Sequence, residues 1–389
     1  MDTSDLRVAL FSGNYNYVRD GANQALNRLV AYLLRQGVQV RVYSPTVEHP
    51  AFPPTGDLVG VPSVPIPGRS EYRFAIALPG RVRRDLESFN PNVVHVSSPD
   101  VVGHRAVTWA RKRKIAVVAS VHTRFETYLD YYHLAWLEPL VRAALRRFYH
   151  RCEIVLAPAP STAMILRAQR MNRDIAIWTR GIDRDQFNPE RRDMAWRRAQ
   201  GIGDDEMVIA FLGRIVMEKG LDVFADAIHA FAPLGLKYRV LAIGEGPARP
   251  WFEQQLPDAI FTGQLTGPDL ARAFASADVF LNPSVTEAFG NVTLEAMACA
   301  LPVIAAESTG ATNLLRNGVT GTLVDGAEPQ EFADALAAYA RDPQLRRSHG
   351  EGGLAVAKTM DWDTINSAVI RAYKHAVVKR ERLTRMTAR

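Results

Sequence analysis

Arg7-Val8-Ala9-Leu10-Phe11 is the stretch from which the fold follows, because it places a short apolar run directly after a polar beginning. Such a run predicts a buried strand of a parallel sheet. A loop with Gly and Asn follows from Ser12 to Gly21, and from Asn23 to Gly37 apolar residues recur at helical spacing. Residues 38–43 then read as a second strand. This order predicts a βαβ unit and an α/β fold.

The strand-and-helix pattern continues along the chain and restarts once. Candidate strands are residues 93–96, 115–119 and 154–157, and then 207–212, 239–243, 260–261, 279–281 and 303–305. Residues 45–68, rich in Pro and Gly, are interpreted mainly as loop. We therefore expect two α/β domains, residues 1–180 and 181–364, with the hinge between Trp178 and Pro189. Doubly wound sheets bind ligands outside the carboxyl ends of their strands, which predicts a site in a cleft between the domains.

Composition and charge restrict the class of protein. With 389 residues, 47% apolar and 23% charged, the chain is a globular type long enough for two cores. No apolar run approaches the roughly 20 residues that span a bilayer, and the polar start is no secretory signal, so we expect a cytoplasmic protein. Cys152 and Cys299 are too few and too far apart to predict a disulfide framework or a zinc site.

The net charge of +6 conceals an uneven distribution. The first 175 residues carry about +9, the next 195 about −9 and the last 19 about +6. This pattern favours an anionic membrane surface as a partner. No aromatic-interleaved basic motif or zinc finger supports nucleic acid, which we do not expect as a partner.

Residues 286–298, Thr-Glu-Ala-Phe-Gly-Asn-Val-Thr-Leu-Glu-Ala-Met-Ala, place two carboxylates at the ends of a turn-to-helix transition. The turn falls at Phe289 and Gly290, and the helix is expected to start at about Asn291. Backbone N–H groups at a helix start attract phosphate. Glu287 is placed to meet a sugar, and Glu295 to accept hydrogen bonds from a ribose. The alternative is that both carboxylates are simply solvated.

Four motifs in order now resemble the retaining glycosyltransferases of family 4. They are Gly-Arg-Ile-Val-Met-Glu-Lys-Gly at 213–220, Gly-Glu-Gly-Pro at 244–247, Ala-Asp-Val-Phe-Leu-Asn-Pro-Ser at 277–284, and the paired glutamates. The resemblance runs from the first strand to about Trp362 and is stronger in the C-terminal half. It implies the GT-B fold, in which two Rossmann-like domains face each other across a cleft. It also implies that a last helix, at about 365–389, returns to the first domain.

The resemblance further implies the residues of the site. The expected catalytic residues are His122, Glu287, Arg214 and Lys219. The expected donor-binding residues are Gly21, Gly213, Arg214, Lys219, Phe289, Gly290, Asn291, Val292 and Glu295. Arg214 and Lys219 are expected to neutralise the departing diphosphate, the alternative being a solvated charge pair near Glu218. His122 is expected to contact the transferred sugar. Many relatives have two adjacent glycines where this chain has a single one, at Gly21.

Neither a metal nor another cofactor is expected. Asp183 with Asp185, and Asp361 with Asp363, have the spacing of carboxylates that share a divalent metal. The first pair belongs to a Gly-Ile-Asp-x-x-x-Phe linker typical of the family, and the second is interpreted as a helix cap. Retention is expected through an ion-pair-like, front-face displacement in which positioning and charge stabilisation dominate.

The acceptor is predicted from basic and apolar segments of the first domain. Residues 81–84, 111–114 and 136–149 combine arginine or lysine with aliphatic or aromatic residues, and the last of them suits a membrane interface. The prediction is a membrane lipid acceptor and a peripheral location on the inner face of the cell membrane. A soluble sugar or polysaccharide precursor remains an alternative, as does a non-catalytic sugar-nucleotide binding module. The donor stays open between UDP-sugars, such as UDP-glucose and UDP-glucuronic acid, and GDP-mannose.

Overall fold

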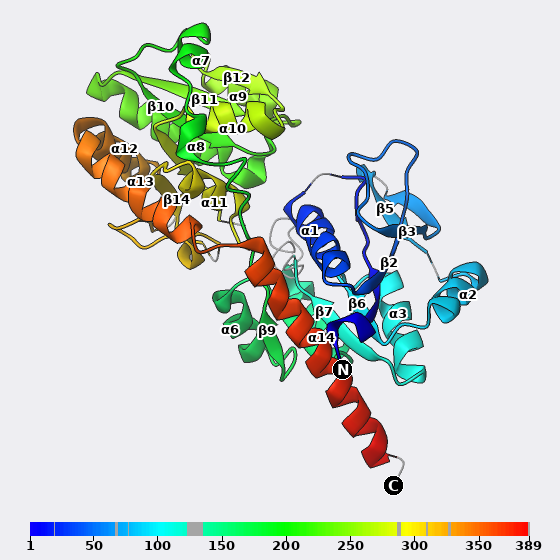
Figure 1. Cartoon of the computed structure of the whole chain (residues 1–389). Coiled ribbons are helices and arrows are strands. Elements are labelled where there is room, and N and C mark those ends of the chain that lie inside the picture. The colour runs from blue at the N-terminus through cyan, green and yellow to red at the C-terminus, as the bar shows by residue number, and fades with distance from the viewer. Residues whose placement is uncertain are drawn as a thin grey trace. The chain divides into compact units, whose positions relative to one another are not determined.

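The computed structural model describes residues 1–18, 20–66, 69–76, 78–122, 135–285, 289–308, 310–325 and 328–387. The chain divides into two compact units, Met1–Arg180 with Trp362–Arg389, and Gly181–Asp361. Each unit is built on one sheet whose paired strands all run parallel, with helices packed against it (Figure 1). This is the α/β architecture that the first strand and helix predict.

The sheet of the first unit has the strand order β3-β2-β1-β6-β7-β8-β9. Its strands are β1 (Arg7–Phe11), β2 (Gln39–Ser44), β3 (Asp57–Gly60), β6 (Val93–Val96), β7 (Ala116–Ser120), β8 (Ile154–Ala157) and β9 (Ile175–Ile177). Successive side chains of a strand point to opposite faces of the sheet, so each strand contributes side chains to two hydrophobic cores. In β1, Ala9 and Phe11 enter one core, whereas Val8 and Leu10 enter the other.

Each face of this sheet is covered by its own set of helices. The core around Phe11 contains residues of α2 (Gly80–Phe89), α3 (Val101–Lys112), α5 (Glu138–Tyr149) and α6 (Pro160–Ala168). The core around Leu10 contains residues of α1 (Gly21–Arg35) and of α14 (Trp362–Thr387). A separate antiparallel hairpin joins β4 (Ser63–Ile66) to β5 (Arg69–Ala75).

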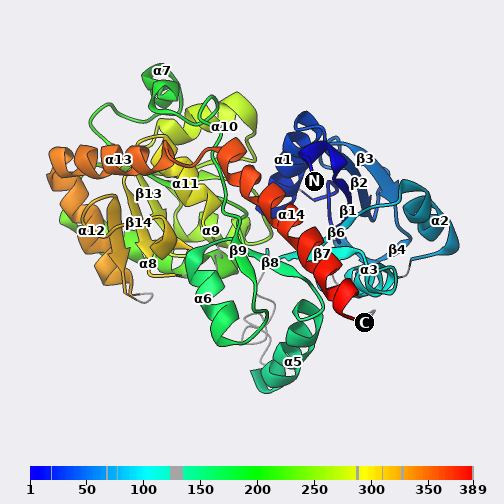
Figure 2. The same ribbon diagram turned by 60° about the horizontal axis from the view of Figure 1, so that its bottom comes forward.

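The last helix, α14, belongs to the first unit although it follows the second in sequence. It contacts β6, β7, β8 and β9, and Figure 2 shows it running along this unit. Val369 and Tyr373 are fully buried in the core that α1 also lines. The helix begins at Trp362, which packs against that core beneath the guanidinium of Arg28. Residues 362–364, which the sequence assigned to the second domain, therefore lie with the first unit.

The sheet of the second unit has the order β12-β11-β10-β13-β14-β15. Its strands are β10 (Met207–Leu212), β11 (Tyr238–Ile243), β12 (Ile260–Gly263), β13 (Val279–Asn282), β14 (Val303–Ala306) and β15 (Gly321–Val324). The helices are α7 (Met194–Ala199), α8 (Leu221–Phe231), α9 (Arg249–Gln255), α10 (Gly267–Ala275), α11 (Asn291–Ala298), α12 (Pro329–Arg341) and α13 (Pro343–Ala357). The core contains the aromatic rings of Phe211, Phe224 and Phe252, which meet edge to face.

The predicted strands are present, but within the described residues five further strands were not predicted. β3 and β4 lie within 45–68, which was interpreted as loop, and β5, β9 and β15 were not predicted at all. β3, β9 and β15 each lie at an edge of a sheet, as β12 also does, and β4 contains Pro65. Edge and hairpin strands are short and half-exposed, and they tolerate proline, so they lack the continuous apolar run that marks a central strand.

Candidate active site

Loops from three neighbouring strands meet at the carboxyl edge of the second sheet. A Cβ on Gly244, after β11, would lie 1.9 Å from the carbonyl oxygen of Gly213, after β10, so only glycine allows this approach. The Ile215 N–H donates to the Glu245 carbonyl at 2.9 Å. Gly220 has a φ of +71° and lies against the Pro283 carbonyl, which follows β13. The sequence motifs at 213–220, 244–247 and 277–284 therefore form one contiguous surface.

Helix α11 starts at this edge. It begins at Asn291, as predicted, with Gly290 as its N-cap residue. Asn282, the last residue of β13, donates through Nδ2 to Thr293 Oγ1 at 3.3 Å and ties the strand to the first turn of the helix. Thr293 and Leu294 are buried. The partly exposed side of the first turns carries Asn291, Val292 and Glu295.

The two candidate cations follow β10. Arg214 is exposed on the loop after this strand, and Lys219 is partly exposed in the short 3-10 turn Met217–Lys219 that precedes α8. β10 and β13 are adjacent parallel strands, so their carboxyl ends lie at the same edge of the sheet. The structure thus places Arg214 and Lys219 on the edge where α11 begins. Phe289 is buried beside that start, and Glu287 lies outside the described residues.

In the first unit, two candidate residues also follow parallel strands. Gly21 is the first residue of α1, and the Asp20 side chain caps this helix by accepting the backbone N–H of Asn23 at 2.8 Å. Burial raises the pKa of the Asp20 carboxyl, and the N–H of Asn23 counteracts part of that rise. His122 lies two residues beyond β7. Parallel strands direct both residues to the carboxyl edge of the first sheet.

His122 is held by side chains that sequence reasoning did not connect with it. Its Nδ1 lies 2.9 Å from an Arg180 guanidinium nitrogen, and its Nε2 lies 2.8 Å from Ser120 Oγ. Ser120 in turn lies 2.9 Å from His95 Nε2. Burial, with a smaller contribution from Arg180, lowers the pKa of His122 well below its ordinary value. His122 is therefore a neutral imidazole at physiological pH.

Strand pairing could have indicated part of this cluster, namely the contact between His95 and Ser120. His95 pairs with Val118 in the register of β6 and β7, and Ser120 lies two residues beyond Val118, on the same face of the sheet. His95 is fully buried in β6. Arg180 lies just beyond β9, which was not predicted, so its burial could not be inferred.

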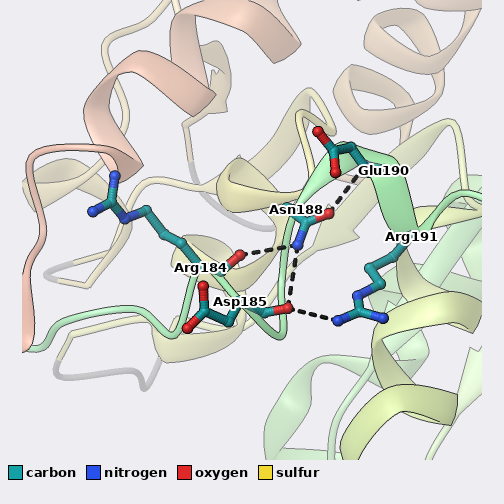
Figure 3. A pocket seen from close by; sticks show the side chains of 5 residues that line it. All are labelled: Arg184, Asp185, Asn188, Glu190 and Arg191. Atoms are coloured by element: carbon teal, nitrogen blue, oxygen red, sulfur yellow. Dashed lines mark hydrogen bonds between the residues drawn. The ribbon is translucent and has the colours of Figure 1, made fainter.

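Another surface feature lies on the linker of the second unit. A hollow there is lined by Arg184, Asp185, Asn188, Glu190 and Arg191 (Figure 3). Asn188 donates to the carbonyls of Arg184 and Asp185, and Arg191 also donates to the Asp185 carbonyl. Asp183 accepts the Gln186 N–H at 3.2 Å. These polar groups bond to one another and stabilise the turn, and we assign the hollow no ligand.

Two features are absent from the residues that the structure describes. No three His, Cys, Asp or Glu side chains there are grouped so that they would hold a metal ion. Within the same residues, no helix has both the length and the apolar character needed to cross a bilayer.

Comparison with known proteins identifies the family. Residues 19–186 match the sequence model described as Glycosyltransferase Family 4, and residues 206–342 match that described as Glycosyl transferases group 1. A GDP-mannose-dependent alpha-mannosyltransferase of Mycolicibacterium smegmatis is 30% identical over 383 residues, which cover 96% of this chain and 99% of that protein. The chain belongs to glycosyltransferase family 4. A protein of the same description from Corynebacterium glutamicum is 28% identical to this family 4 chain, over 97% of it and 91% of the relative.

Solved structures agree on the fold. Sucrose-phosphate synthase from Thermosynechococcus elongatus superposes with a TM-score of 0.79 at 19% identity, covering 96% of this family 4 chain and all of that one. The chain is thus a retaining glycosyltransferase of the GT-B type that uses a nucleotide-sugar donor.

Proposed function

We propose that the protein transfers mannose from GDP-mannose to a lipid acceptor at an anionic membrane surface. The donor is supported by relatives that match the chain over nearly its whole length and are described as GDP-mannose-dependent. The acceptor is supported by one face of α5, on which exposed apolar and basic side chains gather. This face is the observation that carries the membrane part of the proposal.

In the second unit, the start of α11 and the loop after β10 hold the departing nucleotide. The backbone N–H groups of Asn291 and Val292 point toward the end of the helix where anions bind, and those of Phe289 and Gly290 precede them. Arg214 and Lys219 neutralise the diphosphate as its charge grows. Glu295 accepts hydrogen bonds from the ribose. Glu287 contacts the sugar hydroxyls from the segment just before the helix.

In the first unit, His122 contacts the transferred sugar, and Gly21 lets the backbone at the start of α1 approach the donor. The chemistry needs no metal, because Arg214 and Lys219 supply the positive charge that a diphosphate leaving group requires. Positioning of the acceptor hydroxyl beside the departing diphosphate accounts for the rest of the rate.

Helix α5 presents an unusual surface to solvent. Trp136 is 74% exposed and Leu140 is 68% exposed, whereas Leu145, Phe148 and Tyr149 fix the opposite face in the core. Ala143 and Arg147 are also exposed. Positions 140, 143 and 147 recur every three or four residues, so their side chains share one face of α5, and Trp136 lies in the 3-10 turn Ala135–Leu137 that directly precedes this helix. A tryptophan and a leucine beside an arginine suit the headgroup region of a bilayer.

Positive charge gathers at the carboxyl end of this helix. Arg111, at the end of α3, donates to the carbonyl of Arg151, which lies just beyond α5. Burial, together with the charges of Arg111 and Arg147, lowers the pKa of Arg151. Positive charges that lie close together are stabilised by an anionic partner, and anionic lipid headgroups provide one.

The donor is tested by thermal unfolding with GDP-mannose, UDP-glucose and UDP-glucuronic acid. At a concentration of about 100 times the dissociation constant, a ligand of the folded state adds about 2.7 kcal/mol. If the donor-binding unit unfolds on its own, its midpoint rises by about 5–10 °C with the correct donor. GDP-mannose should give the largest rise. A larger rise with either UDP-sugar would overturn the assignment of the donor.

The membrane surface is tested by sedimentation with vesicles that contain anionic phosphatidylglycerol. The natural chain should bind at low salt and less well at high salt, because salt screens the arginines. Trp136→Ser with Leu140→Ser should weaken binding about tenfold or more, since burying each apolar side chain contributes about 1.5–3 kcal/mol when complete. Val319→Ser is the matched control, because Val319 is 56% exposed but belongs to the second unit. Equal binding by all three proteins would point to a soluble acceptor.

A further inference from the structure

A chain of hydrogen bonds links His122 to the last helix. It runs from Arg180 to His122 Nδ1, from His122 Nε2 to Ser120 Oγ, from Ser120 Oγ to His95 Nε2, and from His95 Nδ1 to the Tyr373 hydroxyl, over 2.7–2.9 Å at each step. Exposure is 5% for Arg180, 2% for Ser120, and zero for His95 and Tyr373. Water is therefore largely excluded from these four groups, and each must find its partner within the protein, whereas His122 is partly exposed.

The direction of these bonds follows from Arg180. A guanidinium has donors and no acceptor, so His122 Nδ1 must accept and cannot carry a proton. The proton of the neutral imidazole then lies on Nε2, which donates to Ser120 Oγ. The Ser120 hydroxyl lies between the two histidines and can accept from one and donate to the other. The guanidinium of Arg180 thus sets the tautomer of His122.

The position of Arg180 is itself closely defined. Its Nη1 donates to the carbonyls of Trp178 and Thr179, both at 3.2 Å, and its guanidinium lies 5.0 Å from the centre of the Trp178 ring. The same ring meets the edge of His122 at a centroid distance of 5.6 Å. Trp178 is held in turn by a 3.0 Å hydrogen bond from Nε1 to Asn366 Oδ1, on α14.

The electrostatic surroundings keep His122 uncharged. Arg180 and His95 both disfavour a charge on His122, and desolvation is the larger cause of its low pKa. Burial lowers the pKa of His95 to about 3. Burial lowers the pKa of Arg180 to about 10, and Asp20 acts in the opposite direction, so Arg180 is still a cation at neutral pH. A cation beside Nδ1 makes a second positive charge on the imidazole unfavourable.

We propose that Arg180 is a positioning residue which fixes His122 as the Nε2–H tautomer, with both ring nitrogens hydrogen-bonded within the protein, so that His122 meets the transferred sugar as a neutral ring of fixed orientation and never as a base. The hydrogen-bond chain through Ser120 and His95 to Tyr373 holds the ring in place, which makes α14 part of the support of the site. This inference rests on the proposed contact between His122 and the sugar. It adds the protonation state of the His122 ring and identifies Arg180 as the residue that sets it.

The test uses the full chain labelled with ¹⁵N-histidine, in which the His122 signals are assigned by comparison with His122→Ala. In the natural protein His122 should keep one protonated nitrogen, Nε2, across the range of about pH 5 to 8 in which an unperturbed histidine changes charge. In Arg180→Met the ring should lose its single tautomer, and its pKa should rise so that it titrates within that range. Removal of a nearby positive charge favours the imidazolium, which fixes the sign of this shift.

Kinetics supply the second readout. Arg180→Met should lower kcat about 10- to 100-fold, because small misplacements of a contacting group have effects of this size, while the donor KM changes less than about threefold. Arg180→Lys, which keeps a cation with donors, should recover part of the loss. Arg380→Met is the matched control, because it removes another largely buried arginine of this unit, one that pairs with Glu153 and lies outside the chain of hydrogen bonds.

Tyr373→Phe tests the same chain of hydrogen bonds with a milder change that we expect to leave the fold intact. It keeps the buried ring and removes only the hydroxyl, at the end of the chain opposite to Arg180. It should shift the His95 signals and lower kcat less than Arg180→Met does. If His122→Ala lowers kcat while both the Arg180 variants and Tyr373→Phe leave kcat and the His122 tautomer unchanged, the positioning role is wrong. If His122→Ala itself leaves kcat unchanged, the contact between His122 and the sugar is wrong.

Discussion

Arg214→Ala and Lys219→Ala should each lower kcat about 100- to 1,000-fold, the range found when one preorganised group that stabilises transition-state charge is removed. Both side chains lie on the segment between β10 and α8, at the edge where α11 begins. Charge on the diphosphate is greater in the transition state than in the bound donor, so kcat should fall more than the affinity for the donor. The measurement is the initial rate of nucleoside diphosphate release at saturating donor.

Lys237→Ala provides the control for this experiment. Lys237 is a 72% exposed lysine of the same unit whose ion pair is with Asp205, and its loss should leave kcat within about twofold. Thermal unfolding should show the variants at Arg214 and Lys219 to be folded, because Arg214 is exposed and Lys219 partly so. If both variants keep kcat within about threefold of the natural chain, these cations do not stabilise the leaving group.

Truncation after Asp361 should abolish the folded first unit. It removes Val369, Ile370 and Val377, each at most 9% exposed, together with the fully buried Tyr373. Burial of a Val or Ile side chain contributes about 1.5–3 kcal/mol, and a whole domain is stable by only about 5–15 kcal/mol. The loss is therefore comparable with the entire stability of the unit. Far-ultraviolet circular dichroism and solubility on expression provide the measurement.

A second truncation, after Arg380, separates the buried part of α14 from its end. It retains the ion pairs of Lys379 with Asp174 and of Arg380 with Glu153. Residues 381–383, 385 and 386, which it removes, are exposed. This shorter chain should fold, with an unfolding midpoint within a few degrees of that of the natural protein. If the chain truncated after Asp361 also unfolds cooperatively at that temperature, α14 is not needed for the fold.

The sequence predicted the parts of the fold that depend on continuous apolar runs. β6, β8 and β10 begin and end at the predicted residues, and α11 begins at Asn291. Central strands of a parallel sheet are buried on both faces, so their composition alone identifies them. β3, β9 and β15 lie at sheet edges and have no such run, which is why they were missed.

The candidate site could be predicted only in part, for a related reason. Motifs that are local in sequence, such as 213–220 and the helix start at Asn291, were enough to predict which residues lie at the carboxyl edge of the second sheet. The support of His122 depends on contacts between residues far apart in sequence, with Arg180 58 positions away and Tyr373 278 positions from His95. No spacing rule reveals such contacts, because they arise from the order of strands in the sheet and from the return of α14.

The return of α14 also governs the order in which a nascent chain can mature on the ribosome. Translation at about 5–20 residues per second leaves the amino-terminal half waiting about 10–40 s for its closing helix while Gly181–Asp361 is made. During that interval the surface against which Val369 and Tyr373 pack stays open. The later half, whose sequence is continuous, can complete its own core first. Premature termination before α14 therefore leaves a polypeptide whose first unit lacks its closing helix, even when Gly181–Asp361 is complete.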